Sequence, residues 1–349
     1  MRIELDKIAP DPAVSQPAFP GGARKVEATR RFLVGCLGLL LGLTSVQTQA
    51  QSWPTQTLRI VVPFTPGTGM DTIARTVQPR LAERLGQAVV VVNTPGASGN
   101  IGADNVAKAA PDGYTVLLSA NTMLIAAQLY KNVPFDPIKD FSPVSLAAWG
   151  TLMLVANPKT GIKSVQDLIE RSKARPGSIT YGSPGVGTPH HMAMELFKAK
   201  TGLFMLHVPY RGSAGYIQDI LSGELMVGFL PVHIAQNFVA AGKLTALAVG
   251  SPKRHPVSPN VATLDELGLK GLDVDLWYAF FAPSKTPAPI IERLNTEISA
   301  ILKLAEVREV LGKAGMDAEA STPDALMALS RKDHALWGEV IKRNAISAD

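Results

Sequence analysis

The sequence predicts an α/β protein with about two domains. Its 349 residues exceed the usual size of a single domain and allow substantial hydrophobic cores. Short runs of β-branched residues alternate with amphipathic stretches of helical period, which is the pattern of βαβ units in a mostly parallel sheet. A hydrophobic content of 46% with 18% charged residues indicates a globular chain rather than a disordered one.

The N-terminal region predicts an export signal. An arginine pair precedes an apolar run of 12 residues, Phe32 to Leu43, which is shorter than the about 20 residues that cross a bilayer. A polar patch then leads to Ala50, where we expect cleavage. We interpret residues 29–50 as a signal peptide, and residues 1–28 as an extension that comes from a start codon assigned too far upstream.

Two other interpretations of this region stay open. Leu33 to Cys36 resembles a lipoprotein cleavage box, although most of the apolar run would follow the modified cysteine. Thr29 to Leu33 resembles a twin-arginine export signal. Because Cys36 is the one cysteine of the chain, cleavage near Ala50 leaves none, which excludes disulfides, thiol catalysis and zinc–thiolate sites.

The stretch from Pro63 to Asp71 is the first candidate binding site. It follows a β-rich run, Leu58 to Val62, and precedes a helix whose apolar residues recur four apart until Gly86 closes it. A helix that starts after a glycine-containing turn points unpaired N–H groups and the positive end of its dipole at the turn, where a carboxylate or phosphate fits. An ordinary strand-to-helix connection, with Asp71 favoured near the helix start, is the alternative.

Three further features complete the first half of the chain. Ala88 to Val92 is continuously apolar, so we expect a strand with both faces covered. The glycine-rich turn Asn93 to Gly102 opens a helix, but its G-x-x-G-x-x-G spacing lacks the G-x-G of dinucleotide sites. Tyr114 to Leu118 is a third strand, and Ser119 and Asn121 follow it where open α/β sheets bind ligands.

A second turn of the same kind lies in the second half, which begins near Met153 to Ala156. Ser164 and Asp167 resemble a capping box for a first helix. A short strand, Ile179 to Tyr181, then leads into the glycine-rich turn Gly182 to His191, and a helix follows at once. The sequence therefore predicts two anion-binding turns, one in each half.

The rest of the chain continues the alternation. We expect strands at residues 206–208, 225–230, 244–249 and 277–282. Thr286-Pro287 and Thr322-Pro323 each place a cap and a first-turn proline at the start of a helix. In the loop after residue 208, Tyr210 suits the wall of a cleft. Arg211 would either form a bidentate pair of hydrogen bonds with a substrate carboxylate or be a solvated loop arginine, and we favour the second interpretation.

The sequence carries no recognisable reaction machinery. It has no G-x-S-x-G, H-E-x-x-H or Walker motif. Its six histidines are scattered except for His190 and His191, which do not share a helix face for metal ligation, and we expect one of them to cap or pack at the helix start. Cleavage near Ala50 leaves 28 Lys and Arg against 25 Asp and Glu, too small an excess for a nucleic-acid-binding face. We predict a binding protein without catalytic residues, metal or cofactor.

Several motifs in order along the chain resemble those of the Bug family of tripartite tricarboxylate transporter receptors, the TctC-like periplasmic solute-binding proteins. The resemblance runs from about Trp53 to Arg343. The motifs that carry it are Val62-Pro63-Phe64-Thr65-Pro66-Gly67 with Asp71, Asn93 to Gly102, Ala110 to Tyr114, Tyr181 to Thr188 with His191, His207 to Ser213, and Ala241 to Leu244.

The resemblance implies the type II periplasmic binding protein fold, in which two doubly wound α/β domains joined by two crossing strands close on a ligand like a Venus flytrap. One domain would comprise residues 51–154 and 278–349, and the other residues 155–277. It implies a receptor in the periplasm, not an enzyme, that passes its ligand to the permease subunits of a tripartite tricarboxylate transporter. We expect it to act as a monomer.

The family holds a ligand carboxylate between the first-strand loop and the glycine-rich loop of the other domain, with bridging waters behind it. Carried over by motif, this implies ligand contacts by Thr65, Gly67, Thr68 and Asp71 on one side, and by Ser183, Gly187, Thr188 and His191 on the other. The predicted ligand-binding set also includes neighbours in these turns and loops, namely Phe64, Ser119, Asn121, Gly185, Pro209 and Tyr210.

Two departures from the family pattern bear on the ligand. Thr68 replaces a usual glycine and adds a hydroxyl to the first turn. Leu230 stands where the family often has an aspartate. If that aspartate recognises a ligand amino group, the leucine would remove this recognition. We therefore expect an organic acid, such as a dicarboxylate or keto acid, or an aromatic carboxylate, in preference to an amino acid.

Two alternative functions stay open. A receptor that presents its ligand to a membrane sensor kinase would share this binding site. An exported hydrolase is disfavoured by the missing motifs, but catalytic triads are recognised by geometry rather than by sequence order.

Overall fold

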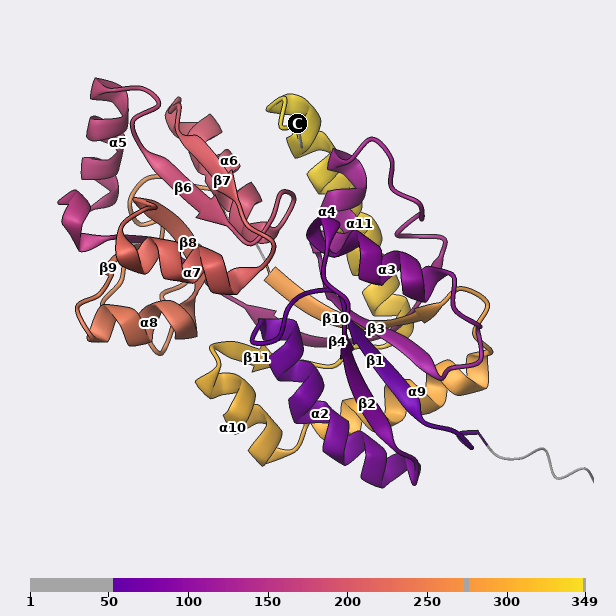
Figure 1. Ribbon diagram of the computed structural model, residues 1–349. Helices are drawn as coiled ribbons and strands as arrows, with labels where there is room; N and C mark the ends of the chain where they lie inside the picture. Colours follow the sequence, from indigo (N-terminus) through magenta and orange to yellow (C-terminus); the bar gives the residue numbers. More distant parts are fainter. Residues whose placement is uncertain (1–52, 273–275, 348–349) are drawn as a thin grey trace, which may run out of the picture. The chain divides into compact units, whose positions relative to one another are not determined.

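The computed structural model describes residues 53–272 and 276–347, and from Trp53 onward the chain forms one compact unit (Figure 1). Two β-sheets organise this unit. The predicted extension at residues 1–28 and the predicted signal peptide at residues 29–50, with both alternative interpretations of that region, lie outside the described residues.

The first sheet has six strands in the order β11-β4-β10-β3-β1-β2. They are β1 Leu58–Val62, β2 Val89–Asn93, β3 Thr115–Ala120, β4 Phe141–Gly150, β10 Leu276–Pro283 and β11 Met316–Ala318. The helices that pack on it or on one another are α2 Gly69–Leu85, α3 Asn100–Ala107, α4 Thr122–Leu129, α9 Ala288–Leu302, α10 Ala305–Lys313 and α11 Pro323–Arg343, with a 3₁₀ turn at Ala97–Gly99. We call this sheet with these helices the first lobe.

The second sheet has five strands in the order β7-β6-β8-β5-β9. They are β5 Leu152–Ala156, β6 Thr180–Ser183, β7 Leu206–Pro209, β8 Val227–Pro231 and β9 Thr245–Val249. Its helices are α5 Val165–Ala174, α6 Pro189–Thr201, α7 Ser213–Ser222 and α8 Val232–Ala240, with a 3₁₀ turn at Pro158–Thr160 (Figure 1). We call this sheet with these helices the second lobe.

The chain changes sheet twice. Thr151 alone separates β4, which pairs with β10 and β11, from β5, which pairs with β8 and β9. The chain is back in the first sheet at Leu276, which begins β10 and lies opposite Gly150 of β4. The sequence-based boundaries after residues 154 and 277 lie close to these two changes of sheet, and the division into two domains stays a prediction.

The expectation of mostly parallel sheets is wrong. β1 pairs in parallel with β2 and β3, as β6 does with β7 and β8. β10 is antiparallel to β3 and β4, and β5 is antiparallel to β8 and β9, so both sheets are mixed. β5 and β10 are buried at every position. Burial on both faces selects the continuous apolar sequence that is typical of parallel strands, so the sequence does not show that these two strands are antiparallel.

The expectation that both faces of residues 88–92 are covered is also wrong. β2 lies at the edge of the first sheet, and Val90 and Val92 are 40% and 38% exposed. Valine favours strands because of its branched β-carbon as well as through burial. A run of valines therefore predicts a strand, but it does not predict that both faces of the strand are buried.

Three predicted helix ends are confirmed. α2 ends at Gly86, which is in the left-handed conformation. The Ser164 hydroxyl caps α5 by accepting from the N–H of Asp167, and the Thr322 hydroxyl caps α11 in the same way. These signals are local, since each involves residues within one helical turn of each other.

The predicted cap at Thr286 is wrong. Pro287 is the N-cap of α9, and Thr286 Oγ1 instead donates a hydrogen bond to the carbonyl of Pro283 at 2.7 Å. A threonine hydroxyl can form a hydrogen bond with any of several nearby backbone groups. A threonine before a proline therefore does not by itself predict a helix cap. β4 and α4 lie where the sequence analysis assigned no element.

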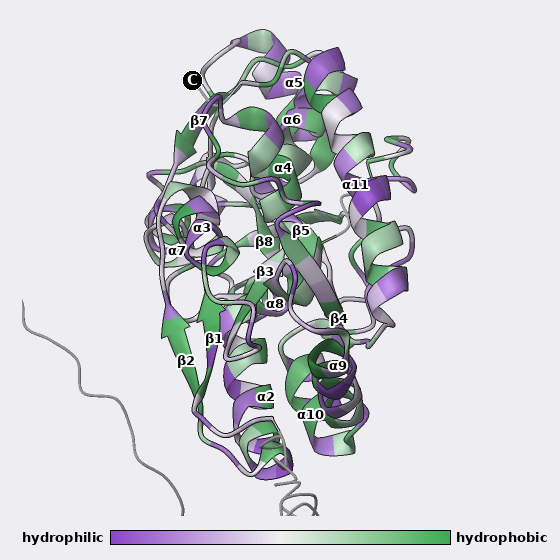
Figure 2. Ribbon diagram, turned by 90° about the vertical axis from the view of Figure 1, so that its right-hand side faces the viewer, coloured by the Kyte–Doolittle hydropathy of each residue, from purple (hydrophilic) through white to green (hydrophobic). Residues whose placement is uncertain are grey.

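The strands are more hydrophobic than the outer faces of the helices. In Figure 2 strands such as β1 and β2 are predominantly hydrophobic, whereas α11 alternates hydrophobic and hydrophilic residues. β3 is buried at every position. Within residues 53–272 and 276–347, no helix combines the length and the hydropathy that a membrane span requires.

Candidate functional site

The turn between β1 and α2 is built around a threonine cap. Thr68 is the N-cap of α2, and its Oγ1 accepts a hydrogen bond from the N–H of Asp71 at 3.3 Å. The Asp71 carboxylate in return accepts from the N–H of Gly67 at 3.0 Å. The turn therefore satisfies two of its backbone donors internally and holds the start of the helix in place.

The turn between β6 and α6 repeats this construction. Thr188 is the N-cap of α6, and its Oγ1 accepts from the N–H of His191 at 3.4 Å. His191 Nδ1 accepts from the N–H of Gly187 at 3.2 Å. Gly67 and Gly187 have φ of +85° and +78°, a conformation that glycine adopts without steric cost. Histidine thus takes the place in the second turn that aspartate holds in the first.

Each helix presents the remaining N–H groups of its first turn to the turn that precedes it. At α2 these belong to Gly69 and Met70, which have no acceptor among the described residues. At α6 Pro189 has no N–H, so the first turn presents that of His190. The first lobe therefore offers the richer set of backbone donors.

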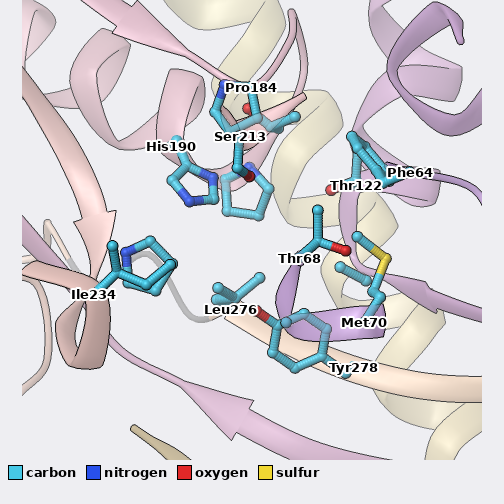
Figure 3. Close-up of a pocket in the computed structure, with 15 residues that line it drawn as sticks. Phe64, Thr68, Met70, Thr122, Pro184, His190, Ser213, Ile234, Leu276 and Tyr278 are labelled. Atoms are coloured by element: carbon cyan, nitrogen blue, oxygen red, sulfur yellow. The ribbon is translucent and has the colours of Figure 1, made fainter. Parts of the chain in front are cut away.

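Both helix starts open into one small cavity of about 30 Å³ (Figure 3). Thr68 and Thr188 line it, together with the polar side chains of Thr122, His190, Ser213 and Tyr278. Figure 3 shows Thr68, Ser213 and His190 around the same space. The volume suffices for about two waters, since one needs at least about 10–15 Å³.

A larger cleft of about 770 Å³ shares Phe64 and Pro184 with the small cavity. The first lobe contributes Thr65, residues 95–99, Ile101 and Tyr130. The second lobe contributes residues 184–186 and 209–211. Its volume lies in the range of small-molecule sites, so this cleft has room for a ligand body.

The first turn is supported by a carboxylate network. Asp71 also accepts hydrogen bonds from Arg75 Nε and from Asn93 Nδ2, each at about 3.0 Å. Burial raises the pKa of the Asp71 carboxyl, but the hydrogen bonds from Arg75, Gly67 and Asn93 outweigh it, so the pKa lies below its usual value. Asp71 therefore stays ionised at neutral pH and faces its own turn.

The second turn is supported by stacked rings. His191 stacks on His207 with ring centroids 4.3 Å apart, and His207 stacks on Tyr181 at 4.7 Å. His207 Nε2 lies 2.8 Å from Ser183 Oγ, which donates to the carbonyl of Gly185. Burial lowers the pKa of His191 to about 4 and that of His207 to about 3, so both rings are neutral at neutral pH.

The two lobes touch at the rim of the cleft. A Cβ on Gly185 would lie 2.6 Å from Ser98 Oγ of the first lobe, and a Cβ on Gly212 would lie 2.7 Å from Thr65 Oγ1. No larger residue fits at these positions unless the lobes separate or the side chains move. The structure therefore shows the lobes closed on each other.

The predicted ligand-binding residues divide into two groups. Seven line one or both cavities: Phe64, Thr65, Thr68, Gly185, Thr188, Pro209 and Tyr210. The other seven line neither: Gly67, Asp71, Ser119, Asn121, Ser183, Gly187 and His191. Ser119 and Asn121 are buried, and Asn121 Nδ2 donates to Asp333 at 3.2 Å. Their neighbours Ala120 and Thr122 line the small cavity instead.

Several lining residues were not predicted. Ser98 and Ser213 lie inside motifs already singled out, so their small polar side chains were a usable signal. Tyr278 lies in a buried strand and reaches the cavity because residue 69 is glycine, where a Cβ would be 2.5 Å from its hydroxyl. His190 is buried, its Nδ1 has no partner among the described residues, and burial lowers its pKa to about 3. No sequence signal marked Tyr278, whereas His190 lies inside the predicted second turn and was expected only to cap or pack at the helix start.

No group of three or more His, Cys, Asp or Glu side chains suited to a metal ion occurs in the part of the chain that the structure describes. His190 and His191 point to different surroundings, the small cavity and the ring stack. This agrees with the expectation that neighbouring helical residues do not share a face.

The fold and the site define a class of protein. Two α/β lobes joined by two crossings, with a cleft lined from both, form a periplasmic solute-binding protein of the type II fold. The family model described as "Tripartite tricarboxylate transporter family receptor" matches residues 73–346. The chain belongs to this family, whose members are solute-binding receptors and not enzymes. The resemblance found in the motifs is thereby confirmed.

Relatives with similar sequences match about nine-tenths of the chain. Protein BugT of Bordetella pertussis is 32% identical over 89% of this chain and 96% of its own length. The UPF0065 protein in the tcbD-tcbE intergenic region of Pseudomonas sp. strain P51 is 35% identical over 92% of this chain and 96% of its own.

Solved structures agree in fold. The periplasmic binding protein BugD is 30% identical with a TM-score of 0.80, over 84% of this chain and 99% of its own. Rpa4515 of R. palustris, with adipate, is 33% identical with a TM-score of 0.81, over 84% of this chain and 99% of its own. MatC from Rhodopseudomonas palustris, with bound malate, is 29% identical with a TM-score of 0.79, over 83% of this chain and 100% of its own.

Proposed function

We propose that this protein captures a small carboxylate ligand in the cleft between its lobes and delivers it to the membrane permease of a tripartite tricarboxylate-type transporter. The observation that carries the proposal is that the N-caps of α2 and α6, Thr68 and Thr188, line the same cavity. Two helix dipoles then direct their positive ends at one place, where a negative charge is stabilised. The adipate and malate in structures of relatives are both carboxylates, which supports this choice of ligand.

The predicted site residues act in two ways under this proposal. Thr65, Thr68, Thr188 and Tyr210 line the space where the ligand and its bridging waters would lie. Asp71, Ser183, His191 and the glycines beside them hold the turns that aim the backbone donors. Waters in the small cavity would link a carboxylate to the hydroxyls around it without weakening the site.

The proposal includes export to the periplasm, with residues 29–50 as the signal peptide and cleavage near Ala50. It also includes two domains, residues 51–154 with 278–349 and residues 155–277, that close on the ligand as a monomer. N-terminal sequencing of the protein from a periplasmic fraction tests the export step, and a mature chain that begins upstream of residue 29 contradicts it.

A thermal-shift screen against a carboxylate library tests the ligand class. A ligand that binds only the folded state stabilises it, by about 2.7 kcal/mol at a hundred times its Kd, so a carboxylate should raise the Tm. The matching neutral amides are the control and should not. If no anionic compound raises the Tm, the proposed ligand class is wrong. Co-purification with permease subunits rather than with a sensor kinase tests the delivery step.

A further inference from the structure

The described residues that line the two cavities carry a single formal charge. No Asp or Glu lies among the described residues that line the 770 Å³ cleft or the small cavity. The one arginine is Arg211, in the loop between β7 and α7, and His190 is neutral because it is buried. A ligand ammonium group would meet no counter-charge here, whereas a second anionic group would meet a guanidinium.

Arg211 is available to a ligand. Its side chain is exposed and has no hydrogen bond or ion pair among the described residues. Most arginines on the surface of the first lobe are engaged instead, as Arg75 is with Asp71 and Arg293 with Glu297. The acidic residue close to Arg211 in sequence, Asp219, accepts a hydrogen bond from the Tyr210 hydroxyl.

The backbone on both sides of Arg211 contacts other parts of the protein, although the Arg211 side chain itself has no hydrogen bond or ion pair among the described residues. The N–H of Tyr210 donates to the carbonyl of Ser183 at 3.0 Å, which ties the loop to the second glycine-rich turn. Gly212 lies against Thr65 of the first lobe. The guanidinium therefore starts from a defined position at the wall of the cleft, and a ligand has to order only the side chain.

We propose that Arg211 is the specificity-determining residue for a second anionic group, so that the ligand is a dicarboxylate or a carboxylate with another acidic group. The inference rests on the proposed function, because one carboxylate is taken to sit at the starts of α2 and α6. The second carboxylate then receives the paired N–H groups of the guanidinium, a geometry that carboxylate oxygens match. Leu230 supports the same choice, because it is fully buried in the apolar core of the second lobe and offers no charge to an ammonium group.

The test compares ligands that differ only at the far end. Isothermal titration measures the binding of α,ω-dicarboxylates from malonate to suberate, and then of the monomethyl ester and the ω-amino analogue of the tightest one. For adipate the analogues are monomethyl adipate and ε-aminocaproate. The wild-type protein should bind the diacid at least about 10-fold more tightly than either analogue, the effect of about 1.4 kcal/mol from a charged hydrogen bond.

Variants assign this preference to Arg211. Arg211→Gln should weaken binding of the diacid about 10-fold or more and leave the monoester unchanged, and Arg211→Lys should fall between because it keeps the charge without the fork. Arg175→Gln is the matched control, since Arg175 is an exposed arginine of the same lobe that lies outside the cleft, and it should change neither affinity.

The outcomes separate the inference from the proposed function. If the wild-type protein binds carboxylates but prefers no diacid over its analogues, or if Arg211→Gln leaves the preference intact, the inference is wrong and the proposed function stands. If the wild-type protein binds no carboxylate at all, the proposed function fails and the inference fails with it.

Discussion

Thr68 has two roles, one in its helix and one at the small cavity. Its side chain departs from the glycine that the family usually has, and from the sequence we expect that departure to affect the ligand. In the structure the hydroxyl caps α2, as Thr188 caps α6, so the substitution makes the two turns alike. Its hydroxyl also lines the small cavity, so one oxygen serves the helix and the site.

Replacement of Thr68 should reveal the cap. Thr68→Ala should lower the free energy of unfolding by about 1 kcal/mol, because the N–H of Asp71 loses its acceptor. Thr68→Ser keeps the hydroxyl and should cost little, and Thr68→Gly should cost only about a few tenths of a kcal/mol. Urea denaturation measures all three. Equal losses for alanine and serine would mean that the methyl group, rather than the cap, stabilises the turn.

The Asp71 carboxylate supports the first turn through its hydrogen bonds. Asp71→Ala would leave the N–H of Gly67 and the amide of Asn93 without an acceptor, so we expect a loss of about 1–3 kcal/mol in the free energy of unfolding. Arg75→Ala is the control, because the Arg75 side chain is 54% exposed and surface ion pairs contribute at most about 1 kcal/mol. Similar losses for the two variants would show that Asp71 acts through the ion pair instead.

The sequence predicted which residues belong to the turns better than it predicted where their side chains point. Asp71, Ser183 and His191 were expected to contact the ligand because they occur in the motifs. Each faces back into its own turn, where it bonds to a backbone group or a neighbouring side chain. The direction of a side chain in a turn depends on backbone angles that residue types alone do not determine.

At the scale of elements, the two strand–turn–helix units are equivalent in construction and opposed in space. Each has a glycine with positive φ, a threonine cap and an acceptor three residues after the cap. The second unit differs because Pro189 removes one donor and stacked rings replace the carboxylate network. The first unit should therefore make the larger contribution to binding a negative charge.

The second glycine-rich turn makes one of the two described contacts between the lobes. Gly185→Ala should weaken binding of the tightest carboxylate about 10-fold or more, because its Cβ would lie 2.6 Å from Ser98 Oγ and oppose closure. Addition of Ser98→Gly removes that oxygen and should restore part of the affinity. Isothermal titration measures both variants.

Gly202→Ala separates closure from backbone strain. Gly202 ends α6 with φ of +67°, and a Cβ there meets nothing within 4 Å. Alanine at this position should cost stability without a change in affinity, since it strains the backbone but touches no other part of the chain. If Ser98→Gly fails to rescue Gly185→Ala, strain at residue 185 rather than contact between the lobes explains the loss.

For the whole molecule, the buried histidines predict how stability depends on pH. Burial lowers the pKa of His190 to about 3 and that of His191 to about 4, against about 6.5 in an unfolded chain. Below pH about 6.5 the unfolded chain therefore takes up protons that the folded protein does not. The free energy of unfolding should fall as the pH decreases, by up to about 1.4 kcal/mol per pH unit for each histidine.

Urea denaturation between neutral pH and about pH 5.5 measures this slope while carboxylates still stay ionised. His190→Leu removes one buried titrating ring whose Nδ1 has no partner in the described residues, so the slope should decrease by the share of one histidine. An unchanged slope would mean that His190 is protonated in the folded protein. A stability that rises toward acid pH would contradict the depressed pKa values of both histidines.

Local sequence is enough to predict the features that depend on neighbours within a few residues. These are the alternation of strands and helices, the two glycine-rich turns, three helix ends and the motifs that place the chain in its family. Caps and turns satisfy backbone groups of the same turn, and helical period is set within one element, so their causes lie in local sequence.

Features that depend on residues far apart in the chain became visible only in the folded molecule. The directions of β5 and β10 follow from the two changes of sheet. Thr68 and Thr188 line one cavity, and Arg211 is the one charge among the described residues of the cleft wall, because the lobes close on each other. These relations arise from packing between elements, which is stabilised by the burial of apolar surface that the elements share. Such packing leaves no periodicity or motif in the sequence of either segment alone.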